Sequence, residues 1–301
     1  MKWKMHKKWQ AAALAAILAF STGGPMVYPT DVVAGVAHAA QAGGVVWEQG
    51  ERAAVEAYGY GVANLENEGS ARGKILARRA AIADAYRNLA EIIQGVQVNS
   101  ETTMHNLAVQ DDTIRVRVDS LVKGAEIVKE AYEADGTYSV LMRIPLYGKK
   151  GLAAVAFPAV RTAKRESFPP ISPQYEASAL PGQTLEKQYT GVIIDARGLG
   201  LNPTFSPVIL DDNGRKIYGH ENIDTEYAIE HGMVGYTKED IEAERAEGGD
   251  SRAGTTPLVV KAVGLEGHNC NVIITQSDAD FILTMNQKYG FLDSCAVVFE
   301  R

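Results

Sequence analysis

Two kinds of hydrophobic spacing organise the first half of the chain. Residues 51–64 alternate, with Val55, Ala57 and Gly59 on one side and polar or aromatic residues between them. Such alternation predicts a strand with one covered face. Residues 71–94 instead repeat apolar residues at three- and four-residue steps, which predicts one long helix. Gly95 stands where we expect a left-handed C-terminal cap. The predicted apolar stripe consists of Leu76, Ala80, Ala83, Tyr86, Ala90 and Ile93.

The next segments complete a first domain. Residues 96–104 read as a strand. Residues 111–123 fit both a strand and a helix, and we favour the helix. A hairpin follows over residues 125–146, because Asp135-Gly136 is a strong turn signal between two alternating runs. One face of its second arm, with Val140 and Met142, would pack against the long helix. These elements predict a compact α+β domain over residues 45–150.

Prolines mark a change of composition after that domain. Five prolines between Pro158 and Pro181 predict an extended linker over residues 151–188. A second α+β domain is predicted over residues 189–301. It opens with the apolar run Val192–Ile194, typical of a strand buried on both faces.

The rest of the second domain follows from turn and capping signals. A hairpin is predicted around residues 212–214, with a short acidic helix opening at Thr237 and a loop over 248–256. Further strands are expected at 258–263, 272–276 and 296–299, and a helix over 277–289. The predicted fold class is α+β, with two small domains, each a mostly antiparallel sheet with one or two packed helices.

The beginning of the chain has the pattern of an export signal. Four early lysines precede the apolar run of residues 11–20, and Ala37-His38-Ala39 offers the small residues that signal peptidase recognises. We expect cleavage between Ala39 and Ala40, which makes residues 1–39 a signal peptide. The apolar run is too short to span a bilayer, which needs about 20 residues. The mature protein is therefore expected in the periplasm or at the cell surface.

Charge and length narrow the classes of partner. The 301-residue chain has a formal net charge of −7, and the leader contains four lysines but one aspartate. The mature chain is therefore more acidic, which argues against nucleic acid as its main partner. No later segment is long and apolar enough to predict a direct membrane span.

The two cysteines of the chain, Cys270 and Cys295, both lie in the second domain. An even number of cysteines in an exported protein favours a disulfide bond. The alternative is a pair of buried free thiols, since the sequence does not show whether the two Cα atoms lie within about 7 Å.

We find no constellation typical of an enzyme. The mature region contains neither GxSxG nor SxxK, the usual settings of a nucleophilic serine. The carboxylates near Asp211 and Glu239 fall on a predicted hairpin tip and a charged helix, where solvated charge is expected. We therefore expect no catalytic residue, no cofactor and no metal ligand.

One strand nevertheless resembles part of an enzyme family. Residues 192–199 are similar to the first strand of zinc-dependent cell-wall amidases, in which a histidine follows an Asp-Ala-Gly sequence. Gly198 stands in the place of that histidine, and a catalytic zinc needs about three protein ligands. We therefore expect Asp195 and Arg197 to form a structural pair or to shape the turn after the strand.

A second resemblance covers the first domain. Residues 77–98, with the hairpin ending at residue 146, resemble the domain shared by small outer-membrane lipoproteins and the amino-terminal part of the flagellar assembly protein FlgT. The segment 189–219 is similar to a domain of exported relatives without a known activity. The resemblance implies a non-enzymatic envelope protein. The matching positions are Ala80, Ala81, Asp84, Ala85, Leu89, Gly95, Gly136, Tyr138 and Val140.

The chain departs from the lipoproteins because no cysteine lies near its cleavage site. We therefore expect a non-catalytic exported envelope protein without a lipid anchor that binds other envelope proteins, with flagellar or surface-structure assembly as its specific role. Two alternatives from other classes are a cell-wall-polymer hydrolase using the strand that ends at Asp195, and a small-ligand binding module using a cleft between the domains.

Overall fold

The computed structural model describes residues 43–47, 53–63, 65–67, 69–160, 165–173, 175, 182–238 and 252–301. All of these residues belong to one compact unit, Ala40–Arg301. The predicted cleavage site at Ala39 and Ala40, the predicted acidic helix from residue 239 onward and residues 248–251 of the predicted loop lie outside the described residues.

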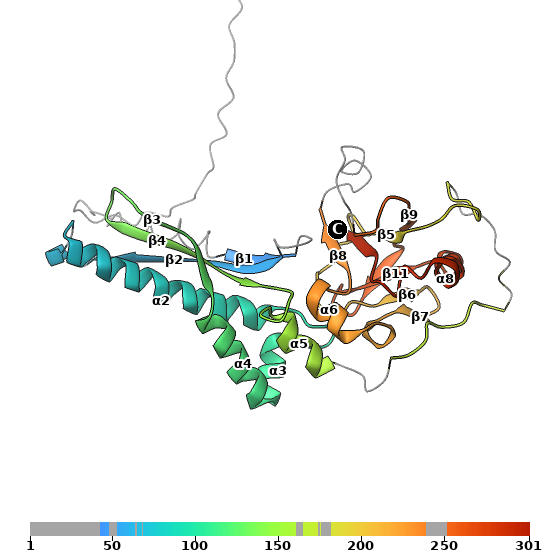
Figure 1. The fold of residues 1–301 in the computed structure, drawn as a ribbon, viewed down its shortest axis with the longest axis horizontal. Coiled ribbons are helices and arrows are strands. Elements are labelled where there is room, and N and C mark those ends of the chain that lie inside the picture. The colour runs from blue at the N-terminus through green and yellow to red at the C-terminus, as the bar shows by residue number, and fades with distance from the viewer. Residues whose placement is uncertain are drawn as a thin grey trace, which may run out of the picture. The chain divides into compact units, whose positions relative to one another are not determined.

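The first half of the described chain is one antiparallel sheet covered by a long helix (Figure 1). The sheet order is β1-β2-β4-β3, and α2 lies along one face. The predicted strand, helix and hairpin are confirmed. The elements are β1 (Gly43–Val46), β2 (Ala54–Val62), α2 (Ala71–Gly95), β3 (Glu126–Tyr132) and β4 (Thr137–Pro145), with a short 3-10 turn at Leu65–Asn67.

The face that α2 buries differs from the predicted stripe. Leu76 is 39% exposed, whereas Ala77, Ala81 and Ala85 are fully buried. The reason is the closeness of helix and sheet. A Cβ atom on Gly59 would lie within 3.0 Å of the Ala81 carbonyl oxygen. Only small residues on both sides allow this approach, so the alanine side of the helix faces the sheet rather than the larger side chains.

Two expectations near the end of α2 are wrong. Gly95 belongs to the helix, and Val96 caps it with an extended backbone at φ −66°. Val96 and Val98 are buried, so their packing keeps the chain extended where a left-handed cap was expected. Residues 96–104 form no strand. They make a tight reversal with one bridge, Gln97 to Thr103, closed by a hydrogen bond from the Val98 N–H to the Thr102 carbonyl at 2.8 Å.

Two short helices follow this reversal. The Thr103 hydroxyl accepts from the Asn106 N–H and opens α3 (Met104–Gln110), which the sequence analysis missed. Asp111 caps α4 (Asp112–Lys123), which confirms the helical interpretation of that segment. Threonine and aspartate are favoured caps because their oxygens satisfy free N–H groups of the first turn.

The predicted linker begins with a helix, α5 (Ala153–Val160), and Pro158 lies inside it. Proline removes one backbone donor, which normally breaks a helix. Here burial outweighs that cost, because Val155, Ala156 and Phe157 are all buried and Phe157 packs edge-on against Phe205.

The described part of the second half contains two four-stranded sheets and the helices α6 and α8, so the α+β class in a two-domain arrangement is confirmed. The prediction of mostly antiparallel pairing is wrong there. One sheet, β8-β12-β5-β9, is parallel throughout. Its two central strands, β5 and β12, are buried on both faces, as parallel strands usually are. Its strands are β5 (Gly191–Asp195), β8 (Gly235–Thr237), β9 (Pro257–Lys261) and β12 (Val297–Glu300).

The other sheet has the order β10-β11-β6-β7, with one parallel pair between two antiparallel pairs. It contains the predicted hairpin of β6 and β7. The remaining elements are β6 (Ile209–Asp211), β7 (Lys216–Tyr218), a 3-10 turn at His220–Asn222, α6 (Thr225–His231), β10 (Gly264–Glu266), β11 (Asn271–Ile274) and α8 (Gln276–Tyr289).

Aromatic side chains join the two halves into one core. Phe205, which follows β5, lies 5.2 Å from Trp47, 6.0 Å from Tyr147 and 6.2 Å from Phe157 between ring centroids. Backbone hydrogen bonds support this contact, since the Ser206 N–H donates to the Val98 carbonyl at 2.8 Å. The core is therefore continuous across the two predicted domains.

The predicted disulfide bond between Cys270 and Cys295 is wrong, because both are free and buried. Cys270 precedes β11 and Cys295 precedes β12, and these strands belong to different sheets. Burial raises the pKa of the Cys270 thiol to about 11 and also raises the pKa of Cys295. Neither thiol is therefore activated as a nucleophile.

The close contact of α2 and β2 predicts a position-specific effect of added methyl groups. Gly59→Ala should lower the free energy of unfolding by about 1–3 kcal/mol, because the helix must move away from the strand. Urea denaturation followed by circular dichroism measures this.

Gly44→Ala in β1 is the matched control, since a Cβ atom there meets nothing within 4 Å. Equal stability of the two variants would contradict the account of the contact.

Candidate functional site

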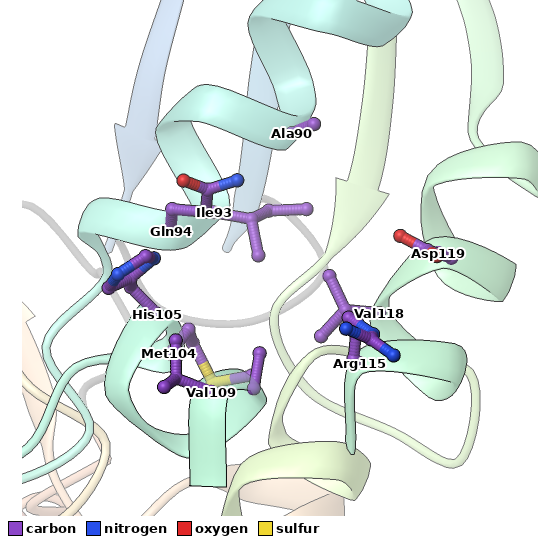
Figure 2. Close-up of a pocket in the computed structure, with 10 residues that line it drawn as sticks. Ala90, Ile93, Gln94, Met104, His105, Val109, Arg115, Val118 and Asp119 are labelled. Atoms are coloured by element: carbon purple, nitrogen blue, oxygen red, sulfur yellow. The ribbon is translucent and has the colours of Figure 1, made fainter. Parts of the chain in front are cut away.

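The helices α2, α3 and α4 surround an apolar groove of about 370 Å³. Figure 2 shows the side chains of all three helices around this space. We call it the three-helix groove. Its lining residues are Ala90, Ile93, Gln94, Met104, His105, Ala108, Val109, Arg115, Val118 and Asp119.

The groove results from the local chain reversals. α2 ends at Gly95, and the reversal at 97–103 leads directly into α3. The floor contains Ile93 and Met104, which are buried. Val109 on α3 is 71% exposed and Val118 on α4 is half-buried, and both line the groove. Apolar groups that stay accessible beside a hollow are typical of binding surfaces.

Polar side chains lie around the groove rather than in its floor. Gln94 and His105 are on one wall, and Arg115 and Asp119 are on the opposite wall (Figure 2). Arg115 also pairs with Asp112 at 2.8 Å. The arrangement can hold an apolar side chain and hydrogen-bond its polar neighbours, and it brings together no nucleophile with a base.

The family-motif residues of α2 have structural roles. The Asp84 carboxylate accepts from the Tyr60 N–H at 3.0 Å, and the Asn88 amide donates to the Tyr58 carbonyl at 2.7 Å. β1 pairs with β2 only as far as Ala57. Asp84 and Asn88 therefore continue the hydrogen bonding of β2 beyond the end of β1.

The other motif positions serve the same contact. Leu89 is fully buried on the face that packs on the sheet, and Ala80 lies near Gly61. Gly95 ends the helix next to the reversal. None of these residues presents a reactive group.

Asp195 and Arg197 form an ion pair, with Nε to Oδ1 at 2.8 Å and Nη2 to Oδ2 at 2.9 Å. Arg197 also lies 3.3 Å from the buried carboxylate of Glu300 at the end of β12. The hydrogen bonds from Arg197 lower the pKa of Asp195. The strand that resembles the amidases therefore ends in a paired cluster.

The histidines of the second half lie in three separate places. His220 is beside Glu221, His231 stacks on Tyr227, and His268 bonds the Ser100 carbonyl. Within the described residues, no group of three or more His, Cys, Asp or Glu side chains is arranged to hold a metal ion.

A buried ionic network was missed by sequence analysis. Arg215 bonds the carboxylates of Asp211 at 2.9 Å and Asp280 at 2.8 Å, and both aspartates are almost fully buried. Its guanidinium also donates to the Pro170 carbonyl at 2.8 Å. The expectation of a solvated Asp211 is therefore wrong. The four-residue spacing to Arg215 was the available signal, but the position of Asp280 depends on the fold.

Comparison with known families gives two matches. Residues 46–144 match the model of the LPP20 lipoprotein family, and residues 191–299 match the second domain of Tp0624 of Treponema pallidum. These findings support a lipoprotein-related envelope protein. Each match covers less than half of the chain, and the comparison with curated proteins found no match. The resemblance to FlgT stays a prediction.

The first match extends from the last residue of β1 into β4 and includes all nine positions that carry the resemblance of the first domain, Ala80, Asp84, Leu89 and Gly95 among them. All the lining residues of the three-helix groove lie within the same range. In the described part of the chain, no helix has both the length and the apolar character of a bilayer span.

The hydrogen bond between the Asp84 carboxylate of α2 and the backbone of β2 predicts what happens when that carboxylate is removed. Asp84→Ala should lower the free energy of unfolding by about 1–2 kcal/mol, because the Tyr60 N–H loses its acceptor. Glu91→Ala on the exposed side of the same helix should change stability by less than about 0.5 kcal/mol. Chemical denaturation of both variants measures the difference in stability. Equal effects of the two substitutions would contradict the proposed role of Asp84 as an acceptor for β2.

The ion pair at the end of β5 predicts a pH dependence. Because Arg197 lowers the pKa of Asp195 in the folded state, the pair stabilises the fold above the unfolded pKa of about 3.9. That contribution is lost as the pH falls through the folded pKa. Asp195→Asn should therefore cost up to about 1 kcal/mol at pH 7, since both groups are partly exposed.

The difference between Asp195→Asn and wild type should shrink as the pH is lowered from 5 toward 2. Asp119→Asn, at an exposed position of α4, is the control. A difference that stays constant over this range would contradict the account.

Proposed function

We propose that this chain is a non-catalytic exported envelope protein that binds another envelope protein through the three-helix groove. The occupant is an amphipathic helix of that partner. The observation that carries the proposal is an apolar groove lined by the exposed Val109 of α3 and the half-buried Val118 of α4, with polar groups of both charges around it.

The dimensions of the groove suit a short helical segment. α3 has seven residues, which corresponds to about 10 Å of helix. A partner helix crosses such a distance in about two turns, so it would insert two side chains spaced three or four residues apart. The space of about 370 Å³ supports that occupancy.

The polar side chains around the groove favour an amphipathic helix over a purely apolar ligand such as a lipid tail. Arg115 and Asp119 lie on one wall, and Gln94 and His105 lie on the other. Polar residues that flank the inserted side chains of an amphipathic helix can hydrogen-bond these groups, whereas a lipid tail offers them no polar atom.

The family match supports a place in the cell envelope, and the leader predicts export into the periplasm or to the cell surface. We further propose that the partner belongs to a flagellar or other surface structure. No catalytic step is assigned, since Asp195, Arg197 and Glu300 engage one another.

A site-specific crosslink tests the groove. A photoreactive amino acid at Val109 should crosslink one envelope protein through an amphipathic helix, as mapped by mass spectrometry. The same group at Val263, which is 55% exposed outside the groove, is the control.

Val109→Glu should reduce retention of that partner by about tenfold, while Val263→Glu should leave it unchanged. Crosslinks of equal yield at both positions, or unchanged retention with Val109→Glu, would contradict the proposal. A crosslinked partner that belongs to the flagellum would support the flagellar role. A deletion strain with normal flagella would contradict that role.

A further inference from the structure

We propose that a second hollow binds a neutral saccharide. This hollow has a volume of about 530 Å³ and lies where the end of α2, the reversal at 97–103 and α3 meet the turn between β10 and β11. We call it the polar hollow. It is distinct from the three-helix groove, since the two have no lining residue in common.

The size and build of the polar hollow fit a small ligand. Its volume falls within the roughly 300–1,000 Å³ of small-molecule sites. Trp47 and Val96 are buried in its floor, and Pro203 is half-buried beside them. The exposed side chains of its lining belong to Glu101, Asn106, Asn202 and His268.

An unusual turn presents the histidine. Gly267, His268 and Asn269 all have left-handed backbones, with φ of 57°, 57° and 62°. Non-glycine residues rarely adopt this conformation. The turn is held by Asn202, whose side-chain amide donates to the His268 carbonyl at 2.9 Å and whose backbone N–H donates to the Asn269 carbonyl at 2.8 Å.

The same turn sets the hydrogen-bonding character of the imidazole. Nδ1 of His268 lies 2.8 Å from the Ser100 carbonyl oxygen. A carbonyl only accepts, so Nδ1 is the protonated nitrogen of the neutral ring. Nε2 is then an acceptor. His268 thereby offers a fixed acceptor to a ligand hydroxyl.

The remaining lining groups decide the class of ligand. The amides of Gln97, Asn106 and Asn202 offer both donors and acceptors, as the hydroxyl groups of a sugar require. Among the described residues that line the hollow there is no lysine or arginine, and the carboxylate of Glu101 would repel an anion. The apolar floor suits the C–H face of a pyranose ring. These features favour a neutral, hydroxyl-rich ligand over a phosphate or a fatty acid.

A native fluorophore makes the proposal testable. The chain has three tryptophans, and the other two, Trp3 and Trp9, lie in the predicted leader. In the full chain carrying Trp3→Phe and Trp9→Phe, all tryptophan fluorescence comes from Trp47 at the hollow. Titration with N-acetylglucosamine and its soluble oligomers should change this fluorescence saturably at millimolar concentration or below.

Substitutions in the hollow should weaken that response. Asn106→Ala should raise the dissociation constant by about tenfold, the effect of one lost hydrogen bond. His268→Asn should also raise the dissociation constant by about tenfold, because it removes the Nε2 acceptor of the imidazole. The turn itself should be kept, since asparagine tolerates the left-handed backbone. Val109→Ala, also exposed on α3 but outside the hollow, is the control.

The possible ligand sources are separated by parallel measurements. Tighter binding of oligomers than of the single sugar, with retention on insoluble cell wall, would indicate a polymeric glycan. Binding of the single sugar alone would indicate a free saccharide. No saturable change, a response that Asn106→Ala and His268→Asn leave unaltered, or preferential binding of glucose 6-phosphate would overturn the proposal.

Binding of the saccharide and binding of the proposed protein partner can be tested independently. Val109→Glu should weaken partner binding by about tenfold and leave the saccharide response intact. Asn106→Ala should weaken saccharide binding and leave partner binding unchanged.

Discussion

The close packing of α2 on β2 is the contact on which the described structure depends. Gly59 and Gly61 leave room for the helix backbone, and the alanines at 77, 81 and 85 meet them without a gap. Asp84 and Asn88 then hydrogen-bond the strand where β1 ends. At this interface the glycines and alanines set the distance between α2 and β2. The hydrogen bonds of Asp84 and Asn88 fix how the helix is aligned along the strand. α2 continues beyond this contact to Gly95, where the burial of Val96 and Val98 begins the reversal that leads into α3.

Both candidate binding sites follow from where α2 ends. The three-helix groove uses the last turns of α2 together with α3 and α4, and the polar hollow uses Gly95 and the reversal that follows. The second half of the chain is attached at the same point, because Thr204 and Ser206 hydrogen-bond the backbone of residues 97 and 98. Phe205 lies between these two residues and packs on Trp47. The proposed protein partner and the proposed saccharide would therefore bind in two separate hollows that both adjoin the end of α2.

The sequence predicted those elements whose patterns are local. The alternation in β2, the length of α2, the hairpin at Gly136 and the ion pair of Asp195 with Arg197 were all foreseen. The buried face of α2 was not, because hydrophobic spacing favours Leu76, while the separation set by Gly59 favours Ala77 and Ala81. Pairing of β5 with β9 and β12 joins segments far apart in the chain, so parallel order could not be read from strand patterns. The groove and the polar hollow likewise depend on tertiary contacts, and no short sequence motif predicts either of them.

Hydrogen exchange at the Tyr60 amide tests the central contact most directly. In β2 this amide has a carboxylate of α2 as its acceptor and lies beyond the end of β1. The account predicts that it exchanges as slowly as the amides bonded within the β2–β4 ladder, and that this protection is lost in Asp84→Ala while the ladder stays protected. Rapid exchange of Tyr60 in the wild-type protein, at the rate of an exposed amide, would contradict it.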